Sequence, residues 1–227
     1  MKKSDELLKY VEWDVKNWSV ALDFWQKNSA KKLFESRVLE IGGGFGGLSL
    51  WFAKQGAHVV CSDFQGVSQI AVELHRAHNV THLIEYETIH ALDIPYTEEF
   101  DIVVFKSVIG VLDDYESQKK AVGGEMYRAL KKNGELFFAE NLVGSPAHMF
   151  LRKKMIRWGN EWRYIKIKEM KDFLAPFSET KLYVHGFAGT FGRNERQRNL
   201  LGFGDQLIFE RIVPKNWKYI ISGVAVK

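Results

Sequence analysis

Hydrophobic positions between residues 38 and 140 alternate between two spacings. Short apolar runs typical of buried strands are separated by segments whose apolar residues recur every three or four positions, as on one face of a helix. This repeated order predicts parallel strands joined by right-handed crossovers, with helices on both faces of the sheet. The expected strands are Val38–Ile41, His58–Ser62, Leu83–Thr88, Phe100–Phe105 and Gly134–Glu140, and the expected helices are Gly46–Lys54, Val67–His78 and Tyr115–Lys131.

The residues on either side of this repeat follow other patterns. Ser4–Lys32 has apolar residues at helical spacing, which predicts one or two helices before the sheet. The elements expected after residue 140 are helices over Ala147–Trp158 and Lys168–Leu174, and strands over Lys181–Phe187 and Tyr219–Val226. Gly189–Pro214, between these two strands, is an insertion rich in Arg, Gly and Asn. The two strands are expected to form a hairpin that closes one edge of the sheet.

Composition places the chain among ordinary globular proteins. It has 227 residues, of which 46% are hydrophobic and 26% charged, and this length suits a single α/β domain. The single cysteine, Cys61, excludes an internal disulfide, so a reducing, cytoplasmic setting is expected. Met1–Val15 lacks the apolar centre of a secretion signal, and no run of about 18 apolar residues predicts a membrane span.

A glycine-rich turn follows the first expected strand. Gly42, Gly44 and Gly47 fit the pattern G-x-G-x-x-G, in which glycine permits a tight turn and lets the backbone approach a ligand. Asp63 ends the second strand, where a carboxylate can accept hydrogen bonds from ribose hydroxyls. Both features are typical of nucleotide sites in general. The alternatives are a turn without ligand and an aspartate that caps a helix.

Glu40 narrows the choice of nucleotide. It stands among Val38, Leu39 and Ile41, where an unpaired buried carboxylate is costly. A pyrophosphate near the turn would be repelled by this carboxylate, whereas a cationic cofactor would be stabilised.

In this region the sequence resembles the class I S-adenosylmethionine-dependent methyltransferases. The stretch V-L-E-I-G-G-G-F-G matches their first motif, and residues 37–140 follow the family's order of elements. The resemblance implies a Rossmann-like, doubly wound sheet of seven strands, mostly parallel, with an antiparallel C-terminal hairpin strand. It also implies binding of S-adenosylmethionine, with S-adenosylhomocysteine as product. The division it suggests is a helical cap over 1–34, a cofactor-binding core over 37–140, substrate-binding elaborations over 141–214 and a last strand over 217–226.

The resemblance also assigns cofactor contacts. Glu40 is expected near the methionine amino end, the glycine loop beneath the cofactor and Asp63 at the ribose. The family's next motif usually begins with an acid, but His90 stands at that position here, so either His90 or Asp93 would meet the adenine. The residues expected to contact the cofactor are Glu40, Gly42, Gly44, Gly46, Asp63, Phe64, His90, Ala91 and Ser107.

Residues that follow the fourth and fifth strands are candidates for catalysis, because reacting groups lie beyond the carboxyl ends of parallel strands. His148 is the candidate general base, with a capping histidine as the alternative. Lys106 would orient an anionic group, with a structural role as its alternative. Asp113, Asp114, Glu140 and Asn141 do not have the spacing of metal-assisted methyltransferases, and no metal is expected.

Two observations bear on the identity of the methyl acceptor: one motif argues against an acceptor class, and a loose resemblance suggests another. Lys106-Ser107 replaces the Asp/Asn-Pro-Pro-aromatic motif of enzymes that methylate nucleic-acid amines, so methylation of DNA adenine is not expected and nucleic acid is a disfavoured partner. Segments 140–154, 186–196 and 213–219 look like methyltransferases of bacterial surface-polysaccharide gene clusters, which suggests O-methylation of a small molecule or a sugar hydroxyl. A group of basic and aromatic residues would either grip an anionic acceptor or form a solvated face: Arg152, Lys153, Lys154, Arg157, Trp158, Trp162, Arg163, Tyr164, Phe191, Arg193, Arg196 and Arg198.

Two other functions remain open at this level. Tyr164 and Lys168 have the Y-x-x-x-K spacing of dehydrogenases that use NAD(P), although Tyr115 and Lys119 share it. The formal charge of +4 and the pI near 9.0 would suit an RNA methyltransferase. The oligomeric state is not predicted. Trp13, Trp18 and Trp25 lie at helical spacing, which favours the core over a lid.

Overall fold

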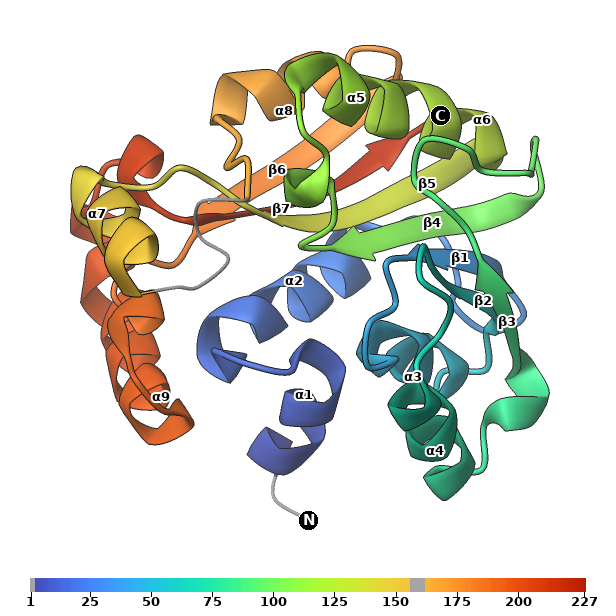
Figure 1. Cartoon of the computed structure of the whole chain (residues 1–227), viewed down its shortest axis with the longest axis horizontal. Coiled ribbons are helices and arrows are strands. Elements are labelled where there is room, and N and C mark those ends of the chain that lie inside the picture. The colour runs from blue at the N-terminus through green and yellow to red at the C-terminus, as the bar shows by residue number, and fades with distance from the viewer. Residues whose placement is uncertain (1–2, 156–161) are drawn as a thin grey trace.

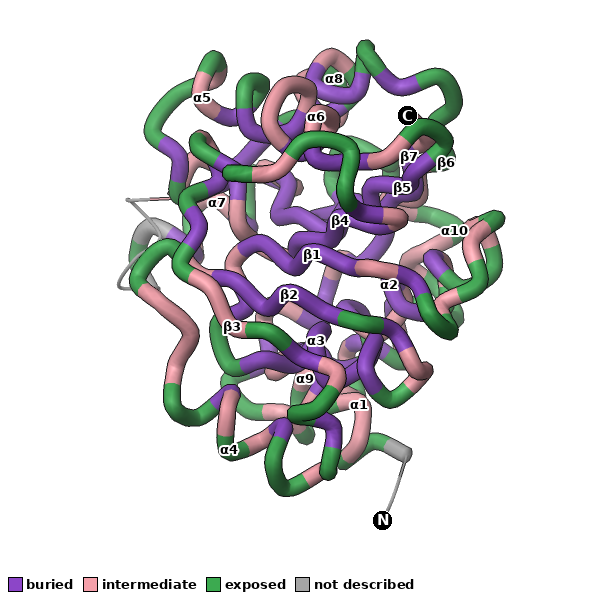
Figure 2. The backbone as a smooth tube through the Cα atoms, turned by 90° about the vertical axis from the view of Figure 1, so that its right-hand side faces the viewer, coloured by how far each residue is buried: buried purple, intermediate pink, exposed green. Residues whose placement is uncertain are grey.

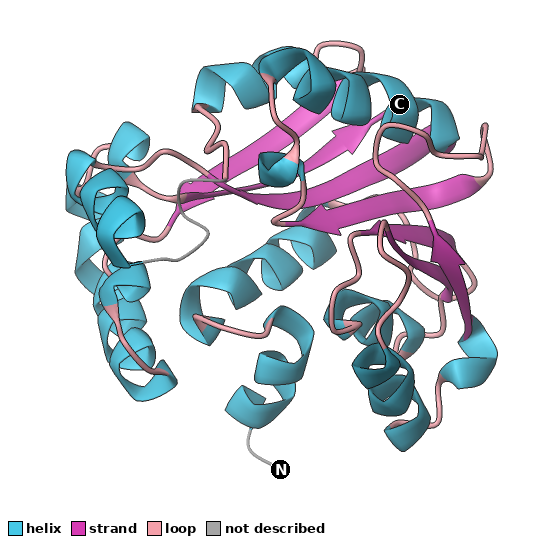
Figure 3. Cartoon of the chain, in the orientation of Figure 1, coloured by secondary structure: helices cyan, strands magenta, loops and turns pink. Residues whose placement is uncertain are grey.

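The computed structural model describes residues 3–155 and 162–227. Its centre is a seven-stranded sheet in the order β3-β2-β1-β4-β5-β7-β6 (Figure 1 and Figure 3). The strands are β1 (Arg37–Ile41), β2 (His58–Asp63), β3 (Ile84–Thr88), β4 (Phe100–Lys106), β5 (Leu130–Asn141), β6 (Glu179–His185) and β7 (Ile220–Val226). β7 runs antiparallel to both β5 and β6, while the β1, β2, β3, β4 and β5 pairings are parallel. The predicted α/β sheet and its antiparallel C-terminal strand are confirmed.

The chain reverses direction across the sheet between β1 and β4. After β1 it moves outward to β2 and β3, and then returns to place β4 on the other side of β1. Such a switch in strand order leaves a crevice at the carboxyl ends of the two central strands. Glu40 lies in this centre, in register with Cys61 of β2 and Val104 of β4.

Helices cover both faces of the sheet, and the sheet separates two hydrophobic cores. On one face lie α1 (Lys3–Val11), α2 (Val15–Asn28), α3 (Gly47–Ala53) and α4 (Gln69–Ala77); on the other lie α5 (Tyr115–Lys119), α6 (Tyr127–Ala129) and α8 (Ile167–Phe173) (Figure 1). The central strands β1, β2, β4, β5 and β7 are mostly buried, whereas the edge strands β3 and β6 are largely exposed or half-buried (Figure 2). α7 (Pro146–Met155), α9 (Glu195–Gly204) and α10 (Glu210–Ile212) lie at the end of the molecule near β6 and β7 (Figure 1).

Two buried tryptophans attach α2 to the sheet. Trp25 donates its indole N–H to the carbonyl oxygen of Phe138 at 3.2 Å and stacks on Phe137. Trp18 is also fully buried. The placement of Trp18 and Trp25 in the core is therefore confirmed, and Trp13 is partly buried and packs against the same core.

Some boundaries differ from the expected ones. The helix expected over Tyr115–Lys131 is α5, a π-helical segment over Lys120–Met126 and α6, and it ends at Ala129 because Leu130 is already extended. The Gly189–Pro214 insertion is largely helical, since α9, a π-helical segment over Asp205–Phe209 and α10 follow one another directly. The last residues of the expected helix over Ala147–Trp158 lie outside the described residues. In the part of the chain that is described, no helix has the length and apolar character needed to cross a membrane.

Gly223 provides a test of packing at the antiparallel edge. A Cβ atom there would collide with the ring of Phe138 and lie 3.0 Å from Leu182. We expect Gly223→Ala to lower the free energy of unfolding by about 1–3 kcal/mol because of this overpacking. Gly124→Ala is the control, since its new methyl group would meet only Lys120 at 3.7 Å. Urea unfolding of both variants checks the prediction, and equal stabilities would contradict it.

Candidate functional site

A pocket of about 310 Å³ opens at the carboxyl ends of the central strands. Seven of the residues expected to contact the cofactor or to act in catalysis contribute to its wall: Glu40, Gly42, Gly44, Asp63, Phe64, Lys106 and Ser107. They come from β1, β2, β4 and the turns that follow these strands. The crevice that the strand order creates is thus the place where these side chains meet.

The glycine turn between β1 and α3 is closely packed. Gly42 has a left-handed conformation, with φ of 72°, and a Cβ atom there would collide with the side chain of Val108. At Gly47 a Cβ atom would lie 2.5 Å from the carbonyl oxygens of Lys9 and Tyr10. The first glycine therefore permits the turn beside the loop that follows β4, and the last permits α1 to approach α3.

Glu40 is buried at the inner end of the pocket. One of its carboxylate oxygens accepts hydrogen bonds from the Ser49 backbone N–H, at 2.9 Å, and from the Ser49 hydroxyl. Burial raises the pKa of Glu40 to about 7, although the bonds from Ser49 oppose this shift, and the nearby Glu12 adds to it. A cation in the pocket would stabilise the ionised form of this carboxylate.

Asp63 stands where β2 ends and shapes the glycine loop. Its carboxylate accepts the backbone N–H of Gly44 at 3.2 Å and that of Gln65 at 3.3 Å. It is half-buried and lines the pocket, so it can also accept hydrogen bonds from a ligand. Phe64, which follows it, is exposed and forms part of the same wall.

The opposite wall comes from the ends of β4 and β5. The Lys106 ammonium lies 3.7 Å from a carboxylate oxygen of Glu12 and 5.2 Å from the centroid of the Trp18 ring. Ser107 has a φ of 53°, which is uncommon for a residue with a side chain, and its hydroxyl accepts a hydrogen bond from the Asn141 amide at 2.9 Å. Beside the apolar side chains of Val108 and Val111, the described part of this wall therefore offers a cation, a hydroxyl and an amide.

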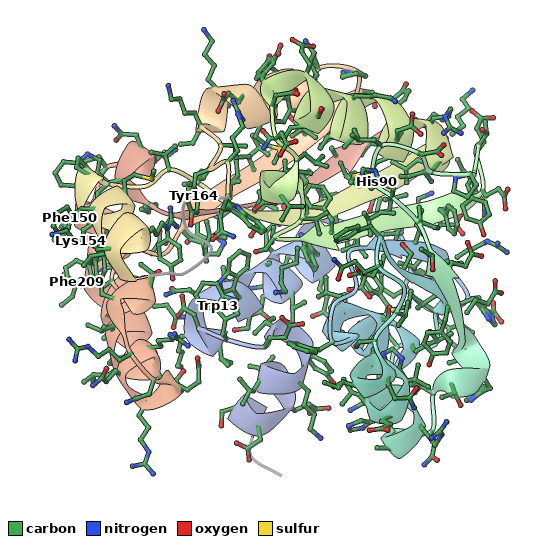
Figure 4. The ribbon with its side chains drawn as sticks, in the orientation of Figure 1. Trp13, His90, Phe150, Lys154, Tyr164 and Phe209 are labelled. Atoms are coloured by element: carbon green, nitrogen blue, oxygen red, sulfur yellow. The ribbon has the colours of Figure 1, made fainter. Side chains whose placement is uncertain are left out.

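The turn between α1 and α2 covers the pocket. Tyr10, Glu12 and Trp13 all contribute to the lining, and Trp13 lies at the turn between these two helices (Figure 4). Glu12 and Asp14 have positive φ angles of 72° and 45°. The helical spacing of Trp13 favoured a core position, and it did not predict the turn between α1 and α2. The available signal was the pair of acidic residues on either side of Trp13, which interrupts the apolar pattern.

Contacts with the C-terminal insertion secure this turn. Glu195 of α9 accepts the backbone N–H of Asp14 at 3.0 Å, and Arg198 lies over the Trp13 ring with its guanidinium carbon 5.5 Å from the centroid. Asp14 is buried and accepts hydrogen bonds from Asn17 and the Tyr219 hydroxyl. Burial raises the pKa of Asp14 to about 7. Residues nearly 200 positions apart thus hold the cover of the pocket.

His148 does not line the pocket. It is buried, its Nδ1 accepts the backbone N–H of Ser145 at 3.0 Å, and its Nε2 lies 2.8 Å from the carbonyl oxygen of Phe187. Burial lowers its pKa to about 4. With both ring nitrogens engaged in joining α7 to the segment after β6, this histidine is placed as a structural residue and not as the expected general base.

Three expected cofactor residues also lie outside the pocket wall. Gly46 packs against His75 and Ala71 of α4, and it starts α3 in a left-handed conformation. His90 is exposed and meets the ring of Phe64 edge-on at 6.2 Å, apart from Trp13 (Figure 4). Ala91 is buried. His90 can therefore influence the pocket only through Phe64 in this structure.

The remaining candidates have mostly internal partners. Arg152 is buried and donates to the carbonyl oxygen of Leu142 at 2.7 Å, with its guanidinium 4.0 Å from the centroid of Tyr164. Tyr164 is buried and Lys168 is exposed, and neither lines the pocket. Trp162 does line it. Arg157 and Trp158 lie outside the described residues, as does the side chain of Lys153.

The residues considered for a metal have other roles. Asp114 caps α5 through the Ser117 N–H at 2.7 Å, and Glu140 is buried and accepts the N–H groups of Val108 and Ile109. Burial raises the pKa of Glu140 to about 7. Among the described residues, no group of three or more His, Cys, Asp or Glu side chains is arranged to hold a metal ion.

Comparison with known proteins shows which domain and which folds the chain is similar to. Residues 39–138 match the family model described as "Methyltransferase domain". The solved structures with the same architecture include phosphoethanolamine N-methyltransferase 2 of Haemonchus contortus, in complex with phosphomonomethylethanolamine and S-adenosylhomocysteine. The two superpose with a TM-score of 0.63 and 17% sequence identity. The match covers 92% of this chain and 52% of that one. Residues 39–138 are therefore similar to a methyltransferase domain, and the chain shares its fold with this methyltransferase, of which it spans about half the length.

Two further relatives are similar over different lengths. A protein of Bacillus halodurans proposed to be a methyltransferase superposes with a TM-score of 0.60 and 20% identity, over 92% of this chain and 99% of that one. A glycine/sarcosine/dimethylglycine N-methyltransferase of Actinopolyspora halophila is 30% identical over 116 residues. These residues are 50% of this chain and 20% of that enzyme, so the chain spans a small part of its curated relative.

The structural role of His148 can be tested by substitution. We expect His148→Ala to lower the free energy of unfolding by about 1–3 kcal/mol, because buried partners lose their hydrogen bonds. Wild-type stability should also fall as the pH drops from 6.5 towards 4, since the unfolded chain takes up a proton that the buried ring resists. The variant should lose part of this pH dependence, as measured by urea unfolding. The exposed His82→Ala is the control, and an unchanged stability of His148→Ala would contradict the assignment.

Proposed function

We propose that this protein transfers a methyl group from S-adenosylmethionine to a small amine. The observation that carries the proposal is the pocket itself, which joins the Glu40 and Asp63 carboxylates and the glycine turn to a polar wall beneath Trp13. The pocket lies where ligands bind in open α/β sheets.

The lining residues fit the cofactor in chemical character. Glu40 offers a buried carboxylate to the amino group and positive charge of the methionine end, and Asp63 offers an acceptor to the ribose hydroxyls. The glycine turn between them allows the backbone to approach the ligand. When bound, S-adenosylmethionine supplies a methyl group that its sulfonium has already activated for transfer.

The charge of the pocket favours an amine over a hydroxyl. Three carboxylates and one ammonium contribute to the described lining, from Glu12, Glu40, Asp63 and Lys106. Glu40 and Asp63 are assigned to the cofactor above, which leaves the Glu12 carboxylate and the aromatic face of Trp13 to attract a cationic acceptor. The two N-methyltransferases named above are in keeping with this acceptor. With a volume near 310 Å³, the pocket suits a small molecule.

The chain's own residues would promote methyl transfer mainly by holding the acceptor amine in position. An unprotonated amine has a free lone pair and can attack without a base, so the absence of histidine from the described lining is no obstacle. Holding the amine in line beneath Trp13 lowers the barrier by removing motional freedom. The Glu12 carboxylate, at 3.7 Å from Lys106, would take the proton that the methylated amine releases.

Methylation of a small-molecule or sugar hydroxyl is the second candidate. Lys106 favours it, because its ammonium lines the pocket and would stabilise the oxyanion of an ionised hydroxyl. This acceptor would agree with the likeness to methyltransferases of polysaccharide gene clusters. The two candidates differ in the atom that receives the methyl group.

Calorimetric titration with S-adenosylhomocysteine, NADH and NADPH tests the cofactor. We expect only S-adenosylhomocysteine to bind, because the Glu40 carboxylate would repel a pyrophosphate. Asp63→Ala should weaken this binding by about 1.5–3 kcal/mol through loss of hydrogen bonds to a charged group, while the exposed Asp23→Ala should not. Transfer of labelled methyl from S-adenosylmethionine to panels of small amines and of sugars or phenols then tests the acceptor. Binding of a dinucleotide alone, or labelling of hydroxyl compounds alone, would refute the corresponding part of the proposal.

The pKa of Glu40 predicts how cofactor affinity depends on pH. The carboxylate of the free protein is ionised above a pH of about 7, and only this form attracts a cation. Affinity for S-adenosylmethionine should therefore fall below this pH, by up to about tenfold per pH unit. In Glu40→Gln, affinity should be lower throughout and should vary only with the ionisation of the ligand. Titrations at several pH values check this, and parallel profiles for the two proteins would exclude the role of Glu40.

A further inference from the structure

The C-terminal insertion forms one continuous helix whose inner side is attached to the protein. α9, the π-helical segment and α10 run from residue 195 to residue 212 (Figure 1, orange). Gly202 packs against Lys16 of the N-terminal region. Asp205 is buried and accepts the backbone N–H groups of Ala188 and Gly189 at 2.7 and 2.9 Å.

The outer side of this helix carries an exposed apolar stripe. Leu200, Phe203 and Leu207 are 74%, 52% and 53% exposed, although solvent exposure of large apolar side chains is unfavourable. Arg196 lies four positions before Leu200, and Arg211 lies four positions after Leu207. These spacings of three and four place the five residues on one face of a helix. We call this set of five residues the arginine-flanked stripe.

The charge around the stripe is positive. Residues 193–215 contain five basic and three acidic side chains. The acidic ones face internal partners: Glu195 pairs with Arg198 at 2.8 Å, Glu210 pairs with Lys218 at 2.6 Å, and Asp205 is buried. Arg193, Arg196, Arg211 and Lys215 are exposed. The solvent-exposed face of the insertion is therefore both apolar and basic.

We propose that the arginine-flanked stripe binds the surface of a membrane that contains anionic lipids. A helix with bulky apolar residues on one face and flanking arginines lies in the plane of the interface, with the apolar side chains among the acyl chains and the arginines at the lipid phosphates. Ile208, Ile212 and Trp217 are exposed near the stripe and extend its apolar character.

Charge argues against a second copy of the chain as the occupant. In an antiparallel contact between two such helices, Arg196 of one copy would approach Arg211 of the other, and in a parallel contact each arginine would approach its own equivalent. Both arrangements place like charges together, which is unfavourable. An anionic surface instead satisfies both arginines at once.

Flotation of the full chain with vesicles tests this proposal. One set of vesicles contains equal parts of phosphatidylcholine and phosphatidylglycerol, and the other contains phosphatidylcholine alone. We expect binding to the anionic vesicles only, and weaker binding as salt is raised. Phe203→Asp with Leu207→Asp, and separately Arg196→Glu with Arg211→Glu, should each reduce binding about tenfold or more.

A matched pair of substitutions outside the stripe provides the control. Ile70 and Arg76 are exposed on α4, and Ile70→Asp with Arg76→Glu should leave vesicle binding unchanged. Circular dichroism and titration with S-adenosylhomocysteine show whether each variant keeps its fold and pocket. Because all four stripe side chains changed here are exposed, both variants are expected to fold.

The other outcomes would overturn the proposal. Absence of binding to anionic vesicles, or binding that both stripe variants retain, would show that the stripe does not meet a membrane. Light scattering that reveals a dimer, lost in Phe203→Asp with Leu207→Asp, together with no vesicle binding, would identify a second copy as the occupant. None of these results depends on the identity of the methyl acceptor.

Discussion

The close packing of the glycine turn between β1 and α3 is the constraint on which the site depends. A side chain at Gly42 would collide with Val108, and one at Gly47 would meet the carbonyl oxygens of Lys9 and Tyr10. The turn therefore holds the loop after β4 and the end of α1 at contact distance. Because both form walls of the pocket, larger residues at these glycines would displace the walls.

Two groups of buried carboxylates stabilise the parts that surround this turn. Glu40 binds the N-terminal turn of α3 through Ser49, and Glu140 binds the N–H groups of Val108 and Ile109 in the loop after β4. Asp14 and Asp205 share Asn17 as a hydrogen-bond donor and so connect the cover of the pocket to the C-terminal insertion. Burial disfavours the ionised forms of Glu40, Glu140 and Asp14, but the backbone and side-chain donors offset part of this cost.

The cofactor end of the pocket could be predicted because its residues are consecutive or follow a fixed order of strands. Glu40, Gly42, Gly44 and Asp63 all lie within the first βαβ unit, where local spacing determines what meets at the carboxyl edge. Gly46, His90 and Ala91 lie outside the described pocket wall, and their contact with the cofactor stays a prediction. These predictions depended on a general motif, while the actual positions depend on how α4 and Phe64 pack in this chain.

The sequence by itself determined the sheet, its two helical layers and the position of the crevice, because hydrophobic spacing and glycine stereochemistry act over a few residues. Tertiary structure alone decided that Trp13 covers the pocket and that His148 is enclosed between Ser145 and Phe187. It also decided that Leu200, Phe203 and Leu207 stay exposed while Asp205 is buried on the other side of the same helix. These outcomes depend on contacts between residues far apart in the chain, for which no short-range pattern exists.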